Sequence, residues 1–146
     1  MHVEHQLDID APVPTVWRLT EDIEAWPSIS PTMTTVERLD GGDLHAGSQA
    51  KIKQPGQRPA VWTVNEITPN RSFQWETKVF GVKMVAAHHL AEVDGKTRNT
   101  LSIDMVGRGA GLLGKLAGKK VLAAIQTENE GFKRAAEAAA AKPVAD

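Results

Sequence analysis

Apolar residues follow a helical period over only one long stretch of the chain, between Gly111 and Ala141. With Ile125 taken as the centre of one face, a step of about 100° per residue brings four apolar residues to the same side of a helix. These residues are Val121, Leu122, Phe132 and Ala136. Because a stripe of this kind must be buried, the pattern predicts one long amphipathic helix that packs against the rest of the chain.

Two polar residues, Glu128 and Asn129, fall on the same stripe. An isolated buried carboxylate is energetically costly, so Glu128 is expected at a rim, beside a partner or facing a wet cavity. The first turns of the helix contain Gly111, Gly114 and Gly118, each of which costs about 1 kcal/mol relative to Ala in a helix interior. This composition predicts that the first two turns are mobile or bent.

Strict alternation of apolar and polar residues over residues 2–10 predicts a half-buried strand at the start of the chain. After Pro12, apolar residues recur at helical spacing up to Ile23, which indicates one short helix or two. Pro27 and Pro31 end this helical segment, because proline removes a backbone donor and disfavours helix at the preceding residue.

Between residues 32 and 107 the period changes to that of strands. Six strands are predicted, at residues 33–39, 48–54, 60–67, 72–79, 82–93 and 100–107. The segments between them are rich in Gly, Pro, Asp and Asn, which favour tight turns. Short connections of this kind join antiparallel neighbours.

The predicted order is therefore one strand, two short helices, six strands and one long helix. This order favours an α+β fold with a seven-stranded antiparallel sheet. One apolar face of such a sheet needs a cover, and the C-terminal helix is the only element long enough to supply it. A curved sheet around one helix tends to enclose a space, which is either filled or hollow.

Several segments in this order resemble a known superfamily. They are IDAPVPTVW, EAWPSISP, VNEITPNRSFQWET, HHLAEVDGKTRNTLSIDMVG and GLLGKLAG. The chain resembles the START-like or SRPBCC superfamily, and more narrowly its bacterial polyketide cyclase/dehydrase and lipid-transport group. The resemblance implies the helix-grip fold, in which the sheet wraps the last helix around a hydrophobic cavity. It implies ligands such as lipids, sterols, polyketides, plant hormones or aromatic substrates, but it transfers no catalytic residue.

Length and composition limit the number of domains and exclude several classes of site and partner. The 146 residues fit a single domain, residues 1–146, in which residues 142–146 are expected to fray. The absence of cysteine excludes disulfides and thiolate zinc sites. No apolar run is long enough to span a membrane, and the N-terminus does not resemble an export signal, so a cytoplasmic protein without stable membrane insertion is expected. The net charge of −1 argues against nucleic acid as a partner.

Aromatic residues of the middle strands are candidates for a cavity wall. Trp75 and Phe73 share one face of the strand at residues 72–79. The direction of Trp62 is ambiguous, because both faces of its strand are apolar. Large aromatic residues either fill a core or form a wall for a flat ligand.

His88 lies on the apolar side of its strand, and it is the best available general acid or base because its unperturbed pKa is near 6.5. A hydrogen-bonded core histidine fits the same pattern, and His5 is a weaker second candidate. His88 and His89 point to opposite faces, so no metal site is predicted. No cofactor is predicted either.

The predicted ligand-binding set joins these aromatic and polar residues to apolar ones on facing elements. It comprises Trp62, Phe73, Trp75, Met84, His88, Ile103, Met105, Val121, Ile125, Glu128 and Asn129. Within it, Asn129, Glu128 and His88 would form the polar end of the cavity and orient a carbonyl or hydroxyl of the ligand.

Three functions remain open from the sequence. The first is binding of a hydrophobic or aromatic small molecule, such as a lipid or polyketide, between sheet and helix. The second is a cyclase/aromatase that positions a poly-β-keto chain for aldol closure and dehydration, with His88 as the catalytic proton shuttle. The third is a structural or interaction protein with a filled core.

Two surface features concern contacts with partners. Outward apolar residues Val85, Ala87 and Ala91 suggest a homodimer. The glycine-rich segment at residues 107–114 suggests a flexible link beside a membrane or partner contact, but the scattered Lys and Arg residues do not favour that contact.

Overall fold

The computed structural model describes residues 1–141, with the backbone alone for Leu113, and the predicted frayed tail at residues 142–146 lies outside the described residues. Its elements follow the predicted order. They are β1 (His2–Ile9), α1 (Val13–Glu21), η1 (Ile23–Ala25), α2 (Trp26–Ile29), β2 (Thr35–Arg38), β3 (Gln49–Lys53), β4 (Ala60–Thr68), β5 (Ser72–Val79), β6 (Val82–Val93), β7 (Lys96–Val106) and α3 (Ala110–Ala141).

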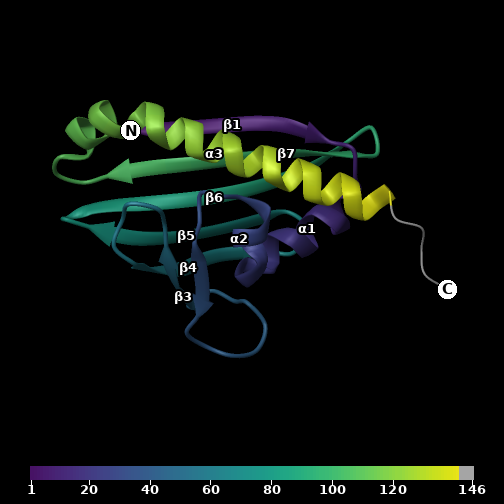
Figure 1. The fold of residues 1–146 in the computed structure, drawn as a ribbon, viewed down its shortest axis with the longest axis horizontal. Coiled ribbons are helices and arrows are strands. Elements are labelled where there is room, and N and C mark those ends of the chain that lie inside the picture. The colour runs from purple at the N-terminus through teal and green to yellow at the C-terminus, as the bar shows by residue number, and fades with distance from the viewer. Residues whose placement is uncertain (142–146) are drawn as a thin grey trace.

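The strands form one antiparallel sheet of seven in the order β1-β7-β6-β5-β4-β3-β2. Helix α3 runs along one face of this sheet, and α1 and α2 lie beside it on the same face (Figure 1). The arrangement is the α+β helix-grip fold that the sequence predicted. The prediction is confirmed in the order of elements and in the antiparallel pairing of consecutive strands from β2 to β7, whereas the pairing of β1 with β7 was not predicted.

The hairpin turns show why some strand ends were predictable. Strands β5 and β6 have the predicted bounds, because Phe80 and Gly81 form a two-residue turn with φ of 51° and 80°. Strand β7 starts at Lys96, four residues before its predicted start. The turn at Asp94 and Gly95 also has positive φ at both positions, so pairing resumes at once and the polar residues after it belong to the strand.

A β-bulge in β4 resolves the direction of Trp62. The register against β5 shifts between Val64 and Glu66. Trp62 and Val64 therefore face the core before the shift, and Ile67 packs against the same core after it. Both faces of β4 are apolar in the sequence because even-numbered residues point to the core before the bulge and odd-numbered residues point to it afterwards.

The apolar stripe of α3 is buried over most of its predicted length. Ile125, Phe132 and Ala136 are each at most 3% exposed. Leu122 was predicted on this stripe but is 37% exposed, because it lies at the edge of the buried face. Helix α3 begins at Ala110 and is continuous through its glycines, and the predicted mobility of its first turns stays a prediction.

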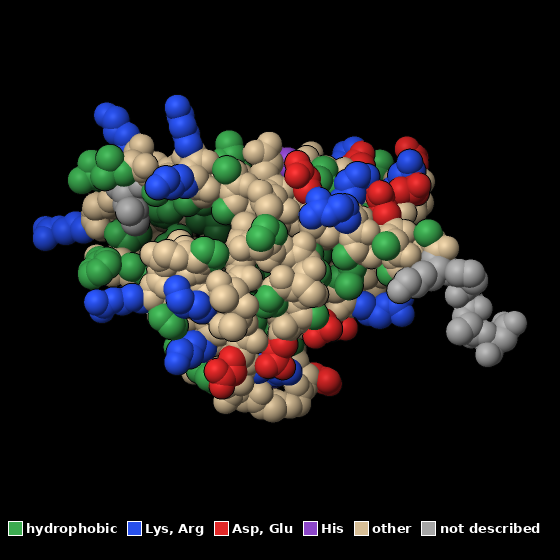
Figure 2. Space-filling model, in the orientation of Figure 1, with side chains coloured by type: hydrophobic (Ala, Val, Ile, Leu, Met, Phe, Trp, Pro, Cys, Tyr) green, Lys and Arg blue, Asp and Glu red, His purple; other side chains and the backbone are tan. Residues whose placement is uncertain are grey.

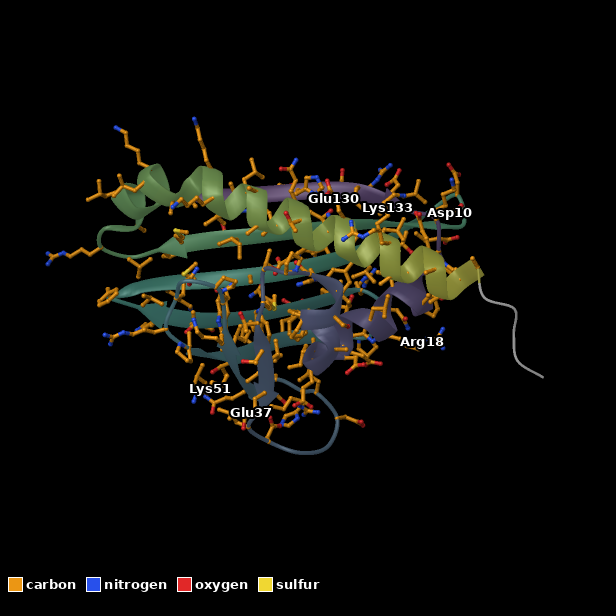
Figure 3. The ribbon with its side chains drawn as sticks, in the orientation of Figure 1. Asp10, Arg18, Glu37, Lys51, Glu130 and Lys133 are labelled. Atoms are coloured by element: carbon orange, nitrogen blue, oxygen red, sulfur yellow. The ribbon has the colours of Figure 1, made fainter. Side chains whose placement is uncertain are left out.

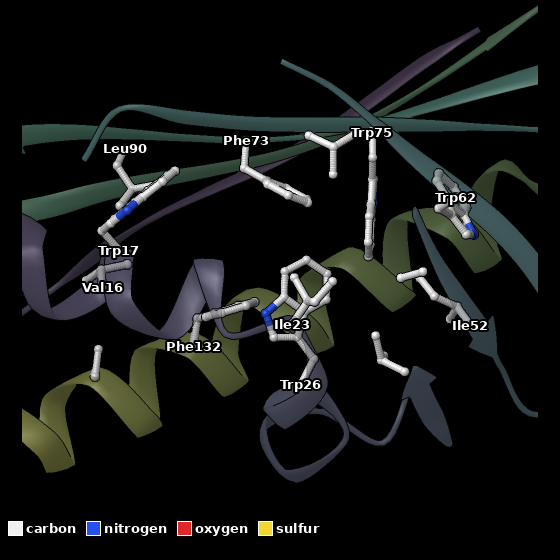
Figure 4. Packing of buried hydrophobic residues seen from close by; sticks show 14 of the residues in the cluster. Val16, Trp17, Ile23, Trp26, Ile52, Trp62, Phe73, Trp75, Leu90 and Phe132 are labelled. Carbon is white, nitrogen blue, oxygen red and sulfur yellow. The ribbon is translucent and has the colours of Figure 1, made fainter. Parts of the chain in front are cut away.

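The aromatic residues gather at the centre of the core, where Trp26 of α2 meets the sheet and α3 (Figure 4). Its ring lies edge-on to Phe73, Trp75 and Phe132, at centroid distances of 5.8, 5.2 and 5.8 Å. Edge-to-face contacts of this kind stabilise aromatic clusters beyond the burial of their area. This cluster fills the space beside α2, whereas a smaller cluster around Met105 lies near the start of α3.

Polar contacts tie the C-terminal half of α3 to the end of β1. Lys133 Nζ donates to Asp8 O at 3.3 Å and to Glu137 Oε2 at 2.5 Å. The backbone N–H of Asp10 donates to the same Glu137 oxygen at 2.9 Å, and Figure 3 shows Asp10 and Lys133 in this region. This end of the helix is therefore held to the sheet by side chains as well as by the core.

Candidate functional site

A cavity of about 260 Å³ lies between the sheet and α3, on the side of the aromatic cluster that faces the start of the helix. The space-filling view shows a hollow with hydrophobic walls at that end (Figure 2). Apolar cavities of about 150 Å³ bind benzene, so the volume accommodates a larger hydrophobic group. The core is thus filled around Trp26 and hollow toward the start of α3.

Two indoles form the aromatic wall of the cavity. Trp62 and Trp75 come from adjacent strands, and their ring centroids are 5.7 Å apart at an interplanar angle of 39°. Both side chains are nearly buried, yet both line the cavity. The opposite wall is aliphatic and comes from α3, through Val121, Ala124 and Ile125. A flat apolar molecule fits between such walls.

His88 lies in the cavity wall among aromatic rings. Its imidazole is 5.0 Å from Trp26, tilted by 33°, and 5.5 Å from Phe132. Within residues 1–141 its Nδ1 atom has no hydrogen-bond partner. Burial, and to a smaller extent the neighbouring His89, lowers the pKa of His88 to about 3, so the ring is neutral at physiological pH. His88 is therefore suited to a neutral hydrogen bond and poorly suited to take up a proton.

Glu128 is the acidic residue of the cavity lining. Thr32 Oγ1 donates a hydrogen bond to Glu128 Oε1 at 3.0 Å. Burial raises the pKa of Glu128 to about 7, against the opposing effect of this hydrogen bond. The carboxyl group is half-protonated near neutral pH, so it can donate or accept a hydrogen bond and can exchange a proton.

The structure brings eight of the eleven predicted site residues together in the cavity wall. They are Trp62, Trp75, Met84, His88, Ile103, Val121, Ile125 and Glu128. Their roles in binding, and a catalytic role for His88, stay predictions. Glu128 and His88 line the same cavity, and their role at its polar end stays a prediction.

The other three predicted residues do not line the cavity. Phe73 is completely buried in the aromatic cluster, and Met105 packs near Val82 and Ala110 in the smaller cluster. Asn129 is completely buried as well, but it faces β1 and β7. Consecutive residues of a helix are about 100° apart, so Glu128 and Asn129 share the inner stripe and still point into different places.

Asn129 instead forms hydrogen bonds that join α3 to β1 and β7. Its Nδ2 atom donates to the backbone oxygens of His5 and Asn99, both at 3.1 Å. The Nδ1 atom of His5 also lies 3.1 Å from it. His5, the weaker histidine candidate, is therefore engaged with α3 rather than with the cavity.

Several lining residues were not predicted from the sequence. Trp26 precedes Pro27, which was predicted to end the helical segment but lies in the first turn of α2. Met33 and Ile52 also line the cavity, as does Lys120 from α3. Thr32, the partner of Glu128, lies in a loop before β2 and carries no periodic signal that would have revealed it.

Within residues 1–141, no group of three or more His, Cys, Asp or Glu side chains could hold a metal ion. In the same part of the chain, no helix is long and apolar enough to cross a membrane.

A helix-grip fold around an apolar cavity defines the SRPBCC class of proteins, as the resemblance in the sequence implied. The chain belongs to the family described as polyketide cyclase/dehydrase and lipid transport, whose model matches residues 1–137. A comparison with curated proteins finds no match.

Solved structures resemble this fold at low sequence identity. The hypothetical protein jhp0584 from Helicobacter pylori is 14% identical, with a TM-score of 0.78, over 92% of this chain and 86% of that one. The protein TTHA0849 from Thermus thermophilus is 17% identical, with a TM-score of 0.75, over 97% and 100%. The ZhuI aromatase/cyclase from Streptomyces sp. R1128 is 22% identical, with a TM-score of 0.69, over 96% and 93%. At these identities the likeness concerns the fold alone.

Proposed function

We propose that this protein binds a hydrophobic aromatic small molecule, with one polar substituent, in the cavity between sheet and α3. The observation that carries the proposal is the wall formed by Trp62 and Trp75 opposite an aliphatic face, with His88 and Glu128 in the same lining. Membership of a family described by cyclases and lipid transport supports a small hydrophobic ligand. A filled core is disfavoured by the cavity volume.

The polar atoms of the lining define the substituent. A neutral His88 accepts or donates one hydrogen bond, and its Nδ1 atom is unpartnered within residues 1–141. Leaving such an atom buried and unpaired is costly, so a ligand hydroxyl or carbonyl that reaches it gains affinity. A phenol or aryl ketone therefore suits this cavity better than a plain hydrocarbon.

The binding test uses 2-naphthol as an aromatic probe and lauric acid as an aliphatic one, with quenching of Trp fluorescence as the readout. Ala124→Leu adds volume to a residue of the lining, whereas Ala123→Leu adds the same volume at an exposed position one residue earlier. We expect Ala124→Leu to weaken 2-naphthol binding at least about tenfold and Ala123→Leu to leave it unchanged. Equal affinities in the two variants, or no binding by the parent protein, would contradict the proposal.

Native mass spectrometry of the purified protein beside a denatured sample complements this test. A co-purifying small molecule would name the ligand class directly. The same spectrum reads the oligomer mass and so tests the predicted homodimer. In the structure Ala87 of that predicted surface is only 5% exposed, because β5 and β7 flank it, so the outward apolar surface is smaller than the sequence implied.

A second function, cyclisation of a poly-β-keto substrate, is favoured by one observation. Glu128 has a pKa of about 7 in the cavity, the value at which a carboxyl group serves best as acid and base near neutral pH. Aldol closure takes a proton from carbon and gives one to the carbonyl oxygen, and dehydration then removes water. We propose Glu128 for these transfers ahead of His88, whose burial keeps it neutral.

This second function is tested with a synthetic poly-β-ketone, by following the absorbance of the aromatic product. Glu128→Gln retains the shape and hydrogen-bonding groups of the side chain but cannot exchange a proton. We expect it to bind the ketone with unchanged affinity and to lose turnover. Equal turnover by the parent protein and Glu128→Gln would exclude Glu128 as the group that transfers protons. Absence of turnover by the parent protein would leave ligand binding as the better description of the site.

A further inference from the structure

Cationic residues gather at the end of the molecule where the cavity opens. Three segments form this end, residues 52–61, 77–85 and 105–127, and we call them together the basic end. They contain eight of the seventeen Lys and Arg residues of the chain and none of its eighteen Asp and Glu residues. The rest of the chain therefore holds nine Lys and Arg against all eighteen acids, so the charge is unevenly distributed. Two of these acids lie at the border of the basic end, Glu76, which pairs with Lys83, and Glu128 in the cavity lining.

The three segments are distant in sequence and adjacent in the fold. A Cβ atom on Gly107 would lie 2.9 Å from Gly81 O, so the β5–β6 turn touches the segment that leads into α3. Gln57, Val79 and Lys120, one from each segment, line the same cavity. Lys and Arg side chains surround the hollow in Figure 2, whereas the acidic side chains of this view lie toward the other end and the lower loop.

Exposed apolar side chains accompany the cations. Six of the eight large apolar residues that are exposed in the described part of the chain belong to the basic end. They include Phe80 at the tip of the β5–β6 turn, which is 101% exposed, and Leu112 and Leu116 on the first turns of α3, which are 66% and 74% exposed. Exposed apolar groups rimmed by charge mark interaction sites rather than ordinary surface.

We infer that the basic end docks on an anionic lipid bilayer, with Phe80, Leu112 and Leu116 inserted between the headgroups. Lys115 and Lys119 are exposed on the same helical turns and make no ion pair within residues 1–141. Positive charge draws a protein to an anionic surface, and apolar side chains hold it there. An acidic protein would satisfy the charge, but it offers no apolar layer for side chains that project as far as Phe80.

Docking in this orientation has a consequence for the cavity. Its mouth lies among the cations and the projecting apolar residues, so it would face the bilayer. A hydrophobic ligand could then pass between bilayer and cavity without crossing water. This inference goes beyond the proposed function, because vesicle binding is measured without any ligand and the two proposals can fail separately.

The test is co-sedimentation with phosphatidylcholine vesicles that contain or lack phosphatidylglycerol. We expect binding to the anionic vesicles only, and weaker binding as salt shortens the Debye length from about 10 Å at 0.1 M to about 3 Å at 1 M. The double variant Lys115→Glu/Lys119→Glu should bind at least about tenfold more weakly. The control Lys96→Glu/Arg134→Glu makes the same change in net charge at exposed positions outside the basic end and should bind as the parent does.

A second variant tests the apolar contribution. Phe80 has a φ of 51°, which Asn tolerates well, so Phe80→Asn preserves the turn and removes the exposed ring. We expect several-fold weaker vesicle binding. Absence of binding to anionic vesicles, or equal losses in the two charge variants, would overturn the inference. Binding to soluble polyglutamate as tight as binding to vesicles, with no effect of Phe80→Asn, would also overturn it and identify an acidic protein as the partner.

Discussion

The side chain of Asn99 donates a hydrogen bond from Nδ2 to Oδ1 of Asn129 at 2.9 Å, and both residues are completely buried. This contact joins β7 to α3 across the core. The amide of Asn129 in turn donates to two backbone oxygens, of His5 and Asn99. The pair therefore locks the helix to two strands at the level of the cavity without contributing to the cavity lining.

Replacement of Asn129 by Ala is expected to destabilise the protein by about 3 kcal/mol, because a buried amide and two buried carbonyls lose their partners. Urea unfolding measures this change. Binding of 2-naphthol by the folded fraction should stay unchanged. Thr127→Ala on the outer side of the same helix removes only a bond to Ala123 O and is the control, with an expected change within about 0.5 kcal/mol. A similar cost for the two variants would show that the network adds no stability.

Trp26 is expected to be the largest single contributor to the core. It contacts three aromatic rings and His88, and its Nε1 atom donates to Leu19 O at 3.1 Å. Trp26→Ala should lower the free energy of unfolding by about 3–5 kcal/mol, as measured by denaturant unfolding. Trp26→Phe retains most of the packing and should cost clearly less. If Trp26→Ala costs no more than about 1 kcal/mol, the aromatic cluster is not the centre of stability.

Glu128 should make stability depend on pH. Its pKa is raised from 4.5 to about 7 in the folded protein, so the folded state binds more protons than the unfolded state between these values. The stability contributed by the protonated carboxyl is complete below about pH 4.5 and is lost as pH rises through about 7. Glu128→Gln should therefore be more stable than the parent at pH 8, by about 1–3 kcal/mol, and similar to it near pH 4.5.

Thermal unfolding of the two proteins across this range measures the effect, and taking their difference cancels the other titrating groups. His88 acts in the opposite direction. Its pKa is lowered to about 3, so its contribution is complete above about pH 6.5 and is lost as pH falls through 3. A constant difference between the parent and Glu128→Gln from pH 4.5 to 8 would mean that the carboxyl titrates as it does in water.

Gly131 should be intolerant of a side chain. A Cβ atom at this position would lie 2.3 Å from the backbone oxygen of Ile29, where α2 packs directly on α3. Gly131→Ala therefore has to push the two helices apart and should lower the melting temperature. Gly118 is the matched control in the same helix, because its nearest neighbour would be 3.6 Å away. Gly118→Ala should be neutral or stabilising by up to about 1 kcal/mol, and a loss as large as that of Gly131→Ala would contradict this account.

The elements of this protein were predictable where the chain determines its own conformation. The turns at Phe80-Gly81 and Asp94-Gly95 are local, and the hairpin of β5 and β6 has the predicted bounds. The long helical period of α3 was equally clear. The start of β7 was predicted four residues too far along the chain, because its first residues are polar. Thr97 and Asn99 are nevertheless buried, since they form hydrogen bonds with residues from elsewhere in the chain.

The cavity lining was predictable in part. The inward direction of Trp75 and His88 follows from the two-residue period of their strands. The direction of Trp62 does not, because the bulge after Val64 depends on pairing with β5. Trp26 and Thr32 lie in the short segments between α1 and β2. Those segments have no helical or strand period from which the direction of a side chain could be predicted.

The sequence by itself determined the order of the elements and the hydrophobic faces, because periodicity and turn chemistry act over a few residues. The helix-grip fold followed from the resemblance to the superfamily. Tertiary structure alone decided that Glu128 faces the cavity while Asn129 faces Asn99, and that the scattered cations of three segments meet at one end. Both depend on which segments become neighbours in space. The burial of a side chain, its pKa and the charge density around it all depend on its neighbours, so they are set only when the chain has folded.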